Sequence, residues 1–367
     1  MDLDELRIAL TALDGELVEI VARRQALSEQ VAAVKRATGR PTRDFARERE
    51  VILRGRSAAA RLGVSPDLAE ALLRQLIQSS LATQEQARVA AQAQGSGKRA
   101  LVIGGRGKMG GWFADFLASQ GFRVHVADPA GPVQGFGFVA DWTGDPLDQD
   151  LIVIATPLSA TPQLLSALAR RRPPGLIFDL GSLKTPLRAG LRDLVDAGCR
   201  VTSLHPMFGP DTELLSGRHV IFIDLGCAAA LAEAQELFAP TMAERVVMGL
   251  DEHDRLIAYV LGLSHALNIA FFTALAESGE AAPRLARLSS TTFDSQLDVA
   301  ARVAAESPDL YFEIQHLNEY GNESLRALQH AVERLVAVVE GGDAAAFTAL
   351  MKRGRLYLDG RAALRAT

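Results

Sequence analysis

The sequence predicts a multidomain protein: an all-helical module, an α/β domain with a parallel sheet, and an all-helical C-terminal domain. Apolar residues recur at helical spacing throughout residues 1–93. From 99 to 250, short apolar runs alternate with helical patterns, which is typical of a doubly wound sheet. Residues 251–367 are again helical in pattern, and 94–98 (Gln-Gly-Ser-Gly-Lys) is expected to be a flexible linker. A chain of 367 residues is long enough for two or three such units.

Turn signals divide the first unit into three helices. Gly39-Arg40-Pro41 ends a long first helix, and Asp44 is suited to cap a second helix that runs to about Ala60. Ser65 followed by Pro66 predicts the start of a third helix, which runs to about Ala93. The predicted strands of the second unit are the apolar runs 100–103, 123–127, 151–155, 176–180, 201–204 and 219–223.

Composition excludes several classes of function. The net charge of −5 argues against a general nucleic-acid binder. The two cysteines, Cys199 and Cys227, lie far apart and predict neither a disulfide framework nor a metal site. The first residues are acidic and lack the apolar core of a signal peptide, so a cytoplasmic location is expected.

One apolar stretch, Leu256 to Ala276, is long enough to span a bilayer and carries no formal charge. Its centre holds Ser264, His265 and Asn268, which are costly in lipid. We therefore expect no membrane span, but a helix buried on all sides within a domain or a dimer interface.

Charged and polar residues in the first unit predict an active site. These are Arg7, Arg24, Lys35, Asp44, Arg47, Glu48, Ser80 and Gln84. Arg24 and Lys35 share one helix face about 16 Å apart, whereas Arg7 points elsewhere, about 25 Å from Arg24. A second, antiparallel copy of the helix could bring Arg7 to the other chain's Lys35, so a site shared by two chains is expected. Such a cationic pocket without a nucleophile suits a small dianion that needs restraint and electrostatic stabilisation.

These residues and their surroundings resemble the all-helical chorismate mutases over about residues 3–90. The resemblance is carried by Arg7, Leu13-Asp14, Arg23-Arg24, Val34-Lys35, Arg40-Pro41, Arg47-Glu48-Arg49 and Ser80-Leu81-Ala82-Thr83-Gln84. It implies that Arg24, Arg47 and the partner chain's Arg7 bind the two carboxylates of chorismate, with Ser80 near one of them. It also implies that Lys35 and Gln84 hydrogen-bond the ether oxygen, and that Glu48, helped by Asp44, holds the ring hydroxyl. The product would be prephenate.

A glycine-rich turn predicts a dinucleotide site in the second unit. An apolar strand leads into Gly105, Arg106, Gly107, Lys108, Met109 and Gly110, a helix follows, and the next strand ends at Asp128. The glycines allow a pyrophosphate close to the backbone at the helix N-terminus, and Asp128 can bind ribose hydroxyls. An acidic residue there favours NAD over NADP, although Arg106 and Lys108 leave the strictness of that choice open.

Three further strand ends carry candidate residues, because ligands of such sheets bind beyond the carboxyl ends of the strands. Thr156-Pro157 is expected to border the nicotinamide, and Asp179 to Lys184 ends the next strand. His205, in Leu204-His205-Pro206-Met207-Phe208-Gly209-Pro210, is placed to accept a proton or hydrogen bond from a substrate hydroxyl.

The segments 204–210 and 179–184, with Glu252-His253-Asp254, resemble the prephenate dehydrogenases over about residues 99–350. The whole chain is similar to the family in which this dehydrogenase is fused to a chorismate mutase. The resemblance implies that His205 bonds the substrate ring hydroxyl during NAD-dependent oxidative decarboxylation to 4-hydroxyphenylpyruvate. Ser182 and His265 would then lie near the substrate, Arg302 would bind a substrate carboxylate, and His253 would be structural.

Two alternatives remain open from sequence alone. The second half could be an arogenate dehydrogenase, although a fused mutase would supply prephenate directly. The chain could instead be a sensor of metabolites and redox state that has no turnover. The family resemblance also implies a homodimer and feedback inhibition by tyrosine, but no separate regulatory domain identifies where tyrosine would act, and neither channelling of prephenate nor coupling of the two sites can be inferred.

Overall fold

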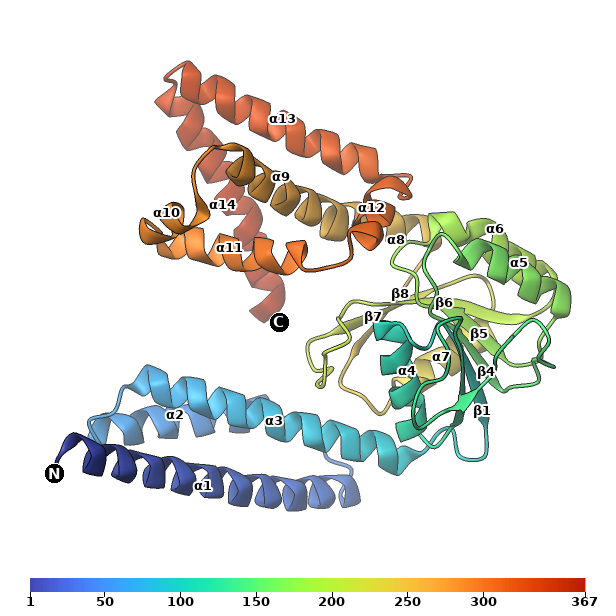
Figure 1. The fold of residues 1–367 in the computed structure, drawn as a ribbon, viewed down its shortest axis with the longest axis horizontal. Helices are drawn as coiled ribbons and strands as arrows, with labels where there is room; N and C mark the ends of the chain where they lie inside the picture. Colours follow the sequence, from blue (N-terminus) through green and yellow to red (C-terminus); the bar gives the residue numbers. More distant parts are fainter. Residues whose placement is uncertain (367) are drawn as a thin grey trace. The chain divides into compact units, whose positions relative to one another are not determined.

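The computed structural model describes residues 1–366, which form two compact units (Figure 1). The first unit comprises Met1–Thr156, Ala160–Gly181 and Ala189–Met248. The second comprises Pro157–Ser159, Ser182–Arg188 and the chain from Gly249 onward. The expected helical module and sheet therefore belong to one unit, and two short segments of the sheet region belong with the C-terminal helices.

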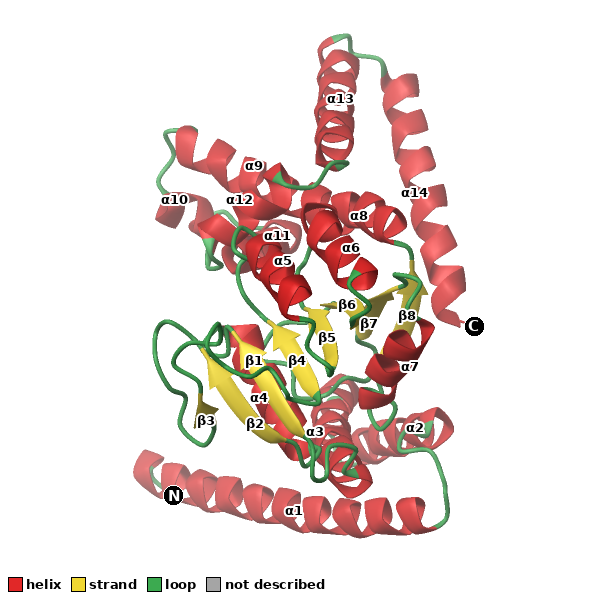
Figure 2. Cartoon of the chain, turned by 90° about the vertical axis from the view of Figure 1, so that its right-hand side faces the viewer, coloured by secondary structure: helices red, strands yellow, loops and turns green. Residues whose placement is uncertain are grey.

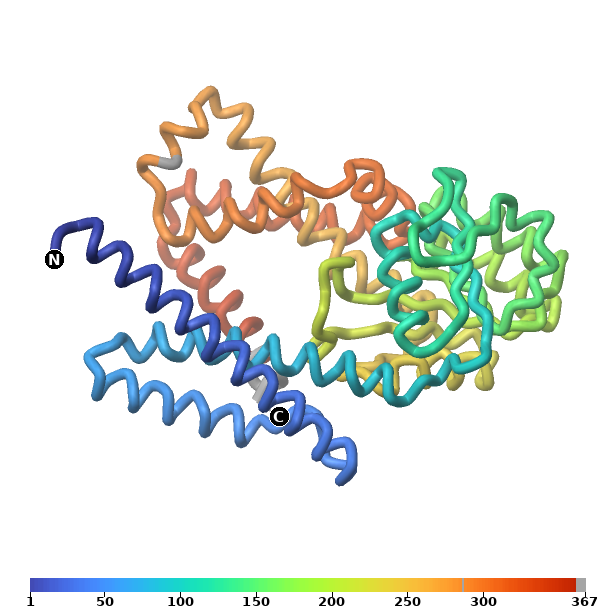
Figure 3. Tube along the Cα trace, turned by 60° about the horizontal axis from the view of Figure 1, so that its bottom comes forward, coloured from blue at the N-terminus to red at the C-terminus, as the bar shows by residue number. Residues whose placement is uncertain are grey.

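Three helices form the N-terminal module, as predicted: α1 (Leu3–Ala37), α2 (Phe45–Arg61) and α3 (Pro66–Gln92). Asp44 caps α2 by accepting a hydrogen bond from the backbone N–H of Arg47 at 2.9 Å. Helix α3 packs against both α1 and α2 (Figure 3), whereas Ala32 is the only buried residue of α1. Most of the apolar surface of α1 thus has no partner among the residues that the structure describes.

An eight-stranded sheet follows, with the order β3-β2-β1-β4-β5-β6-β7-β8 (Figure 2). Its strands are β1 (Arg99–Ile103), β2 (Arg123–Ala127), β3 (Gly137–Phe138), β4 (Leu151–Ile154), β5 (Leu176–Asp179), β6 (Arg200–Pro206), β7 (His219–Ile223) and β8 (Glu244–Met248). The six predicted strands are confirmed. The two edge strands, β3 and β8, were not predicted, because β3 has only two residues and β8 is mostly exposed, so neither carries a strong apolar run.

The sheet is parallel, as predicted, except at one pair, because β6 and β7 are antiparallel. Residues 207–218 connect them without a helix, so the chain cannot cross over to start a parallel strand. All other neighbouring pairs are parallel. The 207–218 connection, which begins beside His205, is named the β6–β7 connection below.

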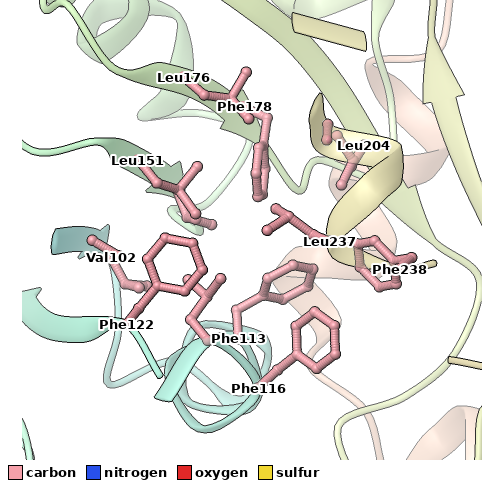
Figure 4. Packing of buried hydrophobic residues seen from close by; sticks show 14 of the residues in the cluster. Val102, Phe113, Phe116, Phe122, Leu151, Leu176, Phe178, Leu204, Leu237 and Phe238 are labelled. Atoms are coloured by element: carbon pink, nitrogen blue, oxygen red, sulfur yellow. The ribbon is translucent and has the colours of Figure 1, made fainter. Parts of the chain in front are cut away.

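The core on one face of the sheet combines aliphatic side chains with a group of phenylalanines (Figure 4). Helices α4 (Lys108–Ser119) and α7 (Ala228–Leu237) cover this face. Phe113 of α4 packs edge-on against Phe178 of β5, with ring centroids 6.0 Å apart. The remaining helical segments of the sheet region are α5 (Thr161–Arg171), η1 (Thr185–Leu187) and α6 (Arg188–Asp196).

The expected linker, residues 94–98, is a turn packed on the sheet region. The N–H of Gly95 donates to the carbonyl of Gln120 at 2.9 Å. A Cβ atom at Gly95 would lie only 1.9 Å from the Phe122 ring, so the backbone approaches that side chain closely. Val89 of α3 is itself part of the hydrophobic core of the sheet. The helical module and the sheet are therefore continuous in packing.

Glu85 of α3 is the main polar connection between the module and the sheet. Its carboxylate accepts hydrogen bonds from the backbone N–H of Leu215 (2.7 Å) and of Met242. Burial raises the pKa of Glu85, while these two N–H groups favour its ionised form. A buried carboxylate thus satisfies two backbone donors that would otherwise lie buried without an acceptor.

The second unit is helical within its described residues. It contains α8 (Leu250–Ile257), the π-helical η2 (Ala258–Leu263), α9 (Ser264–Glu277), α10 (Ala282–Arg287), α11 (Thr291–Ala304), α12 (Pro308–His316), α13 (Gly321–Glu340) and α14 (Ala344–Ala366). Helices α8, η2 and α9 form one continuous helix, Leu250–Glu277, that is long and apolar enough to cross a membrane. Only 28% of its most apolar window is buried within the chain, so the expected burial on all sides is not provided by one chain.

Replacing Glu85 by alanine should destabilise the first unit, because the N–H groups of Leu215 and Met242 would lose their acceptor. Each unsatisfied buried donor costs about 1–3 kcal/mol. We expect a lower midpoint of thermal unfolding for Glu85→Ala, measured by circular dichroism. Glu213→Ala, which removes an exposed acid of the β6–β7 connection, is the matched control and should leave the midpoint unchanged. Equal midpoints for both variants would contradict this role of Glu85.

Candidate functional site

Helices α1 and α3 bring three of the predicted site residues together. The Arg24 guanidinium donates to the Ser80 hydroxyl at 2.8 Å and to the Leu76 carbonyl at 2.9 Å. One turn further along α3, the Gln84 amide donates to Ser28 of α1 at 2.8 Å. Partial burial lowers the pKa of Arg24, although a guanidinium remains charged at any physiological pH. Ser80 and Gln84 therefore share the face of α3 that meets α1.

A cavity of about 560 Å³ lies at the end of this face. Its lining residues are Ala32, Lys35, Arg36, Gly39, Arg40, Pro41, Thr42, Gln84, Arg88, Ala91 and Gln92. Four of them are cations, and none is acidic, so the cavity suits an anion. The Lys35 ammonium donates to the Thr42 carbonyl at 2.6 Å, which holds it at the cavity. The side-chain amide oxygen of Gln84, Oε1, is buried without a hydrogen-bond partner among the described residues.

Arg88 is a cavity residue that the sequence reasoning missed. It lies four residues after Gln84 and therefore on the same face of α3, which is the signal that could have identified it. Its guanidinium reaches the Thr42 hydroxyl and the Ala239 carbonyl, both at 3.4 Å. These long contacts leave it available to an anion in the cavity.

The predicted residues of α2 do not line this cavity in a single chain. Asp44 is occupied as the cap of α2, and Arg47 pairs with Glu50 at 2.6 Å. Glu48 lines a different cavity of about 570 Å³ and binds Arg43. On α1, Arg7 is exposed and pairs with Asp4 at 3.2 Å. One chain thus assembles Arg24, Lys35, Ser80 and Gln84 and leaves the others apart.

The glycine turn between β1 and α4 is shaped for close approach of a ligand. Gly107 caps α4 without a side-chain hydrogen bond, so no cap side chain occupies the first N–H groups of the helix. A Cβ atom at Gly110 would lie 2.2 Å from the Gly104 carbonyl oxygen. Gly104, which the motif did not include, has φ +87° and would clash with the Ala155 carbonyl if it carried a Cβ. These features fit the pyrophosphate of a dinucleotide at the helix N-terminus.

Asp128 lies beside this turn, as predicted. Its carboxylate accepts hydrogen bonds from the N–H of Arg106 (3.0 Å) and of Ala130 (2.9 Å). The Arg106 side chain folds back to the Ala130 carbonyl at 2.6 Å. Asp128 is thereby held at the end of β2, where it can accept hydrogen bonds from ribose hydroxyls. Lys108 and Met109 begin helix α4 itself.

The carboxyl ends of β1, β4, β5 and β6 share one edge of the sheet, because these strands are parallel. Thr156 follows β4 and hydrogen-bonds Thr161 through their hydroxyls at 2.9 Å. His205 is buried near the end of β6, where it is paired with Ile221 of β7. The first unit thus places the glycine turn, Thr156 and His205 along one edge.

In the second unit, a buried carboxylate fixes the segment that carries Ser182. Asp254 accepts hydrogen bonds from the backbone N–H of Lys184 (2.9 Å) and of Thr185 (2.6 Å), and from His253 Nδ1 at 2.6 Å. Burial alone would raise the pKa of Asp254, but the bonds from His253 and Thr185 hold it below its usual value. His253 is fully buried in this arrangement, which is consistent with a structural role.

The two remaining predicted residues lie on separate helices of this unit. His265, on α9, packs against Tyr311 with the two rings tilted and their centroids 4.1 Å apart, and its Nδ1 is buried with no hydrogen-bond partner among the described residues. Burial lowers the pKa of His265, so the imidazole is neutral at neutral pH. Arg302 is exposed on α11. Pro157 belongs to the short segment that packs with these helices.

Comparisons with known proteins cover nearly the whole chain. Residues 6–85 match chorismate mutase type II, 138–247 match the nucleotide-binding domain of prephenate dehydrogenase, and 250–353 match its dimerization domain. The glycine turn and Asp128 precede the second of these ranges, so their assignment depends on the sequence motif and on the geometry described above.

Relatives support the same division. The T-protein of Enterobacter agglomerans is 28% identical over 357 residues, covering 96% of this chain and 92% of that protein. The 4-amino-4-deoxyprephenate dehydrogenase of Streptomyces pristinaespiralis is 30% identical over 263 residues, covering 69% of this chain and 88% of that protein.

A solved structure shows the same fold. Prephenate dehydrogenase from A. aeolicus, in complex with hydroxyphenyl propionate and NAD+, superposes with a TM-score of 0.57 at 18% identity, covering 71% of this chain and 98% of that one. Since a mutase domain and both dehydrogenase domains occur in one chain, the protein belongs to the family of bifunctional chorismate mutase–prephenate dehydrogenases, NAD-dependent enzymes of tyrosine biosynthesis.

Proposed function

We propose that the helical module rearranges chorismate to prephenate with the residues of the cationic cavity, and that the rest of the chain oxidises prephenate with the residues named below. The observation that carries the first half is the cavity itself, which is lined by both Lys35 and Gln84 and by four cations without an acid. Chorismate is a dianion, and its rearrangement breaks a C–O bond while it forms a C–C bond within one molecule. Such a reaction needs restraint and charge stabilisation, and no nucleophile.

In this proposal, Lys35 and Gln84 donate hydrogen bonds to the ether oxygen as its bond to carbon breaks. The Gln84 amide nitrogen uses one hydrogen for Ser28, which fixes the side chain and leaves the other hydrogen for the substrate. Arg24 is fixed by Ser80 and binds a carboxylate, and Arg88 adds a second cation on the same helix. The family resemblance assigns Arg47, Asp44 and Glu48 to the substrate's other end, whereas in one chain they lie outside the cationic cavity and Glu48 lines a different one.

The dehydrogenase half uses His205 as acceptor for the proton of the prephenate ring hydroxyl. NAD, held by the glycine turn and Asp128, would supply the acceptor for the hydride that leaves the carbon carrying this hydroxyl. The electrons of the broken bond to the ring carboxylate then complete the aromatic ring, and carbon dioxide leaves. Ser182 and the neutral His265 contact the substrate, and Arg302 binds a carboxylate. The glycine turn and Asp128 hold the dinucleotide, with Thr156 and Pro157 near its nicotinamide.

We further propose that two chains share each mutase site. Apolar residues of α1 such as Leu10, Leu17 and Val34 are more than half exposed in one chain, which leaves a long apolar surface to be covered. Arg7 lies on this helix, far from Lys35, and a second antiparallel α1 would both cover the surface and deliver Arg7. The incompletely buried helix Leu250–Glu277 supplies a second apolar surface for pairing. Family resemblance also predicts feedback inhibition by tyrosine. Adding tyrosine to an assay of either activity tests this prediction.

The full chain given NAD should produce NADH from chorismate and also from prephenate. Lys35→Ala should abolish NADH production from chorismate but not from prephenate, because the dehydrogenase half does not use Lys35. His205→Asn should reduce both signals by at least about 100-fold, as expected for loss of a catalytic base. Absorbance at the NADH band measures both. NADH from neither substrate would refute the proposal, and arogenate would then be the next substrate to test.

Mixing two inactive variants tests the shared site. Arg7→Ala and Lys35→Ala should each lack mutase activity, but a mixed dimer contains one intact site, formed by Lys35 of one chain and Arg7 of the other. After random re-pairing, about a quarter of wild-type activity should return, because half of the dimers are mixed and each has one of two sites. The control mixes Lys35→Ala with Gln84→Ala, which lie on the same chain's half of the site and should not complement. No recovery in the first mixture would place Arg7 outside the site.

Asp254→Asn should impair the dehydrogenase while leaving the mutase intact. An amide in place of the carboxylate loses one of its two acceptor oxygens, so a backbone N–H of Lys184 or Thr185 is left unsatisfied and the Ser182 segment shifts. At about 1–3 kcal/mol per lost bond, kcat/KM for prephenate should fall roughly 5–100-fold. The exposed neighbour Asp251→Asn is the control. Unchanged prephenate turnover in Asp254→Asn would show that this segment does not position substrate.

A further inference from the structure

Arg43 links the β6–β7 connection of the dehydrogenase part to Glu48, a predicted residue of the mutase site. Arg43 precedes the cap of α2, and Glu48 lies one turn into that helix, so the two side chains face each other at its start. Arg43 donates to both oxygens of the Glu48 carboxylate, from Nε at 2.9 Å and from Nη2 at 3.0 Å. Its remaining terminal nitrogen, Nη1, donates to the hydroxyl of Ser216 at 2.7 Å.

This arrangement fixes the plane of the guanidinium. Two parallel bonds to one carboxylate define its orientation, and the third bond prevents rotation about the first two. The Phe45 ring lies 4.4 Å below the guanidinium carbon and supports it from one face. Arg43 and Glu48 are both partly buried, with side-chain exposures of 31% and 21%, so solvent screens the pair less than it would at the surface.

Ser216 is itself held in place from two sides. The N–H of its neighbour, Leu215, donates to Glu85 of α3, and the Leu215 side chain is buried in the core of the sheet. Earlier in the same connection, the Thr212 carbonyl accepts a hydrogen bond from the Trp112 indole of α4 at 3.0 Å. The hydroxyl that Arg43 meets therefore belongs to a fixed part of the dehydrogenase.

We propose that Arg43 is a positioning residue of the mutase site, and that Ser216, which the dehydrogenase part supplies, holds Arg43 in the orientation that aims the Glu48 carboxylate. A carboxylate has about four lone-pair positions, and Arg43 occupies one on each oxygen, so the other two remain for a substrate hydroxyl. This inference rests on the proposed role of Glu48 in binding the chorismate ring hydroxyl. In this proposal, a residue of the dehydrogenase part contributes to the activity of the mutase module.

The test uses the full chain and measures both activities. Ser216→Ala should lower the mutase kcat/KM roughly threefold to tenfold, which corresponds to the net contribution of one typical hydrogen bond, because Ser216 acts on the substrate only through Arg43. Arg43→Lys keeps the charge but cannot bind both oxygens and Ser216 at once, and should lower it further. Dehydrogenase kcat and KM with prephenate should stay at wild-type values in both variants, which also shows that they are folded. Thr212→Ala, which removes a hydroxyl from the same connection, is the matched control and should affect neither activity.

The double variant separates positioning from a general loss of structure. If Ser216 acts through Arg43, then Arg43→Lys combined with Ser216→Ala should be no slower than Arg43→Lys alone. Additive losses, or a Ser216→Ala enzyme with wild-type mutase activity, would overturn the inference. Wild-type turnover of chorismate together with its loss in Glu48→Gln establishes the proposed function independently. If the wild-type chain does not turn over chorismate, the proposed function fails, and the inference fails with it.

Discussion

Helix α3 has to bury two faces at once, and most of the first unit depends on this constraint. On one face, Ser80 and Gln84 bind residues of α1 and line the cationic cavity. The next face, about 100° round the helix, carries Glu85 and Val89 into the sheet region. Because a helix is rigid over this length, neighbouring residues in sequence place the mutase cavity and the sheet in a fixed relation. The same helix therefore lines the mutase cavity and contacts the β6–β7 connection.

Two buried carboxylates, Glu85 and Asp254, solve the same problem in the two units. Each receives backbone N–H groups that regular structure leaves without an acceptor, from a loop in the case of Glu85 and from the start of η1 in the case of Asp254. Their pKa values nevertheless shift in opposite directions. The pKa of Glu85 is raised, because burial outweighs its two backbone hydrogen bonds. The pKa of Asp254 is lowered despite burial, because His253 adds a third hydrogen-bonding partner that stabilises the charge.

Local patterns predicted the elements well, because they depend on neighbouring residues. Apolar spacing and the Asp44 and Ser65 caps located all three helices of the module, and the glycine motif predicted the turn that lies beside Asp128. What sequence could not predict depends on long-range pairing. The antiparallel β7, the Arg43–Ser216 bond and the contact of Glu85 with Leu215 join residues more than 100 positions apart or depend on strand order. Gly104 was missed because its requirement comes from the Ala155 carbonyl, which follows β4 and is distant in sequence.

The exposed apolar faces and the dispersed mutase residues have a common physical origin. Helix α1 buries one residue in a single chain, although it carries an apolar residue at nearly every turn. A surface of that kind is unfavourable in water by about 25 cal/mol for each Å² left uncovered, so the long helix is a stable choice only if another surface covers it. The same helix carries Arg7 at one end and Lys35 at the other, too far apart to act together in one chain. Covering α1 with its own copy would remove both difficulties, because antiparallel pairing brings opposite ends together. Stability and catalysis in the module would then depend on one contact.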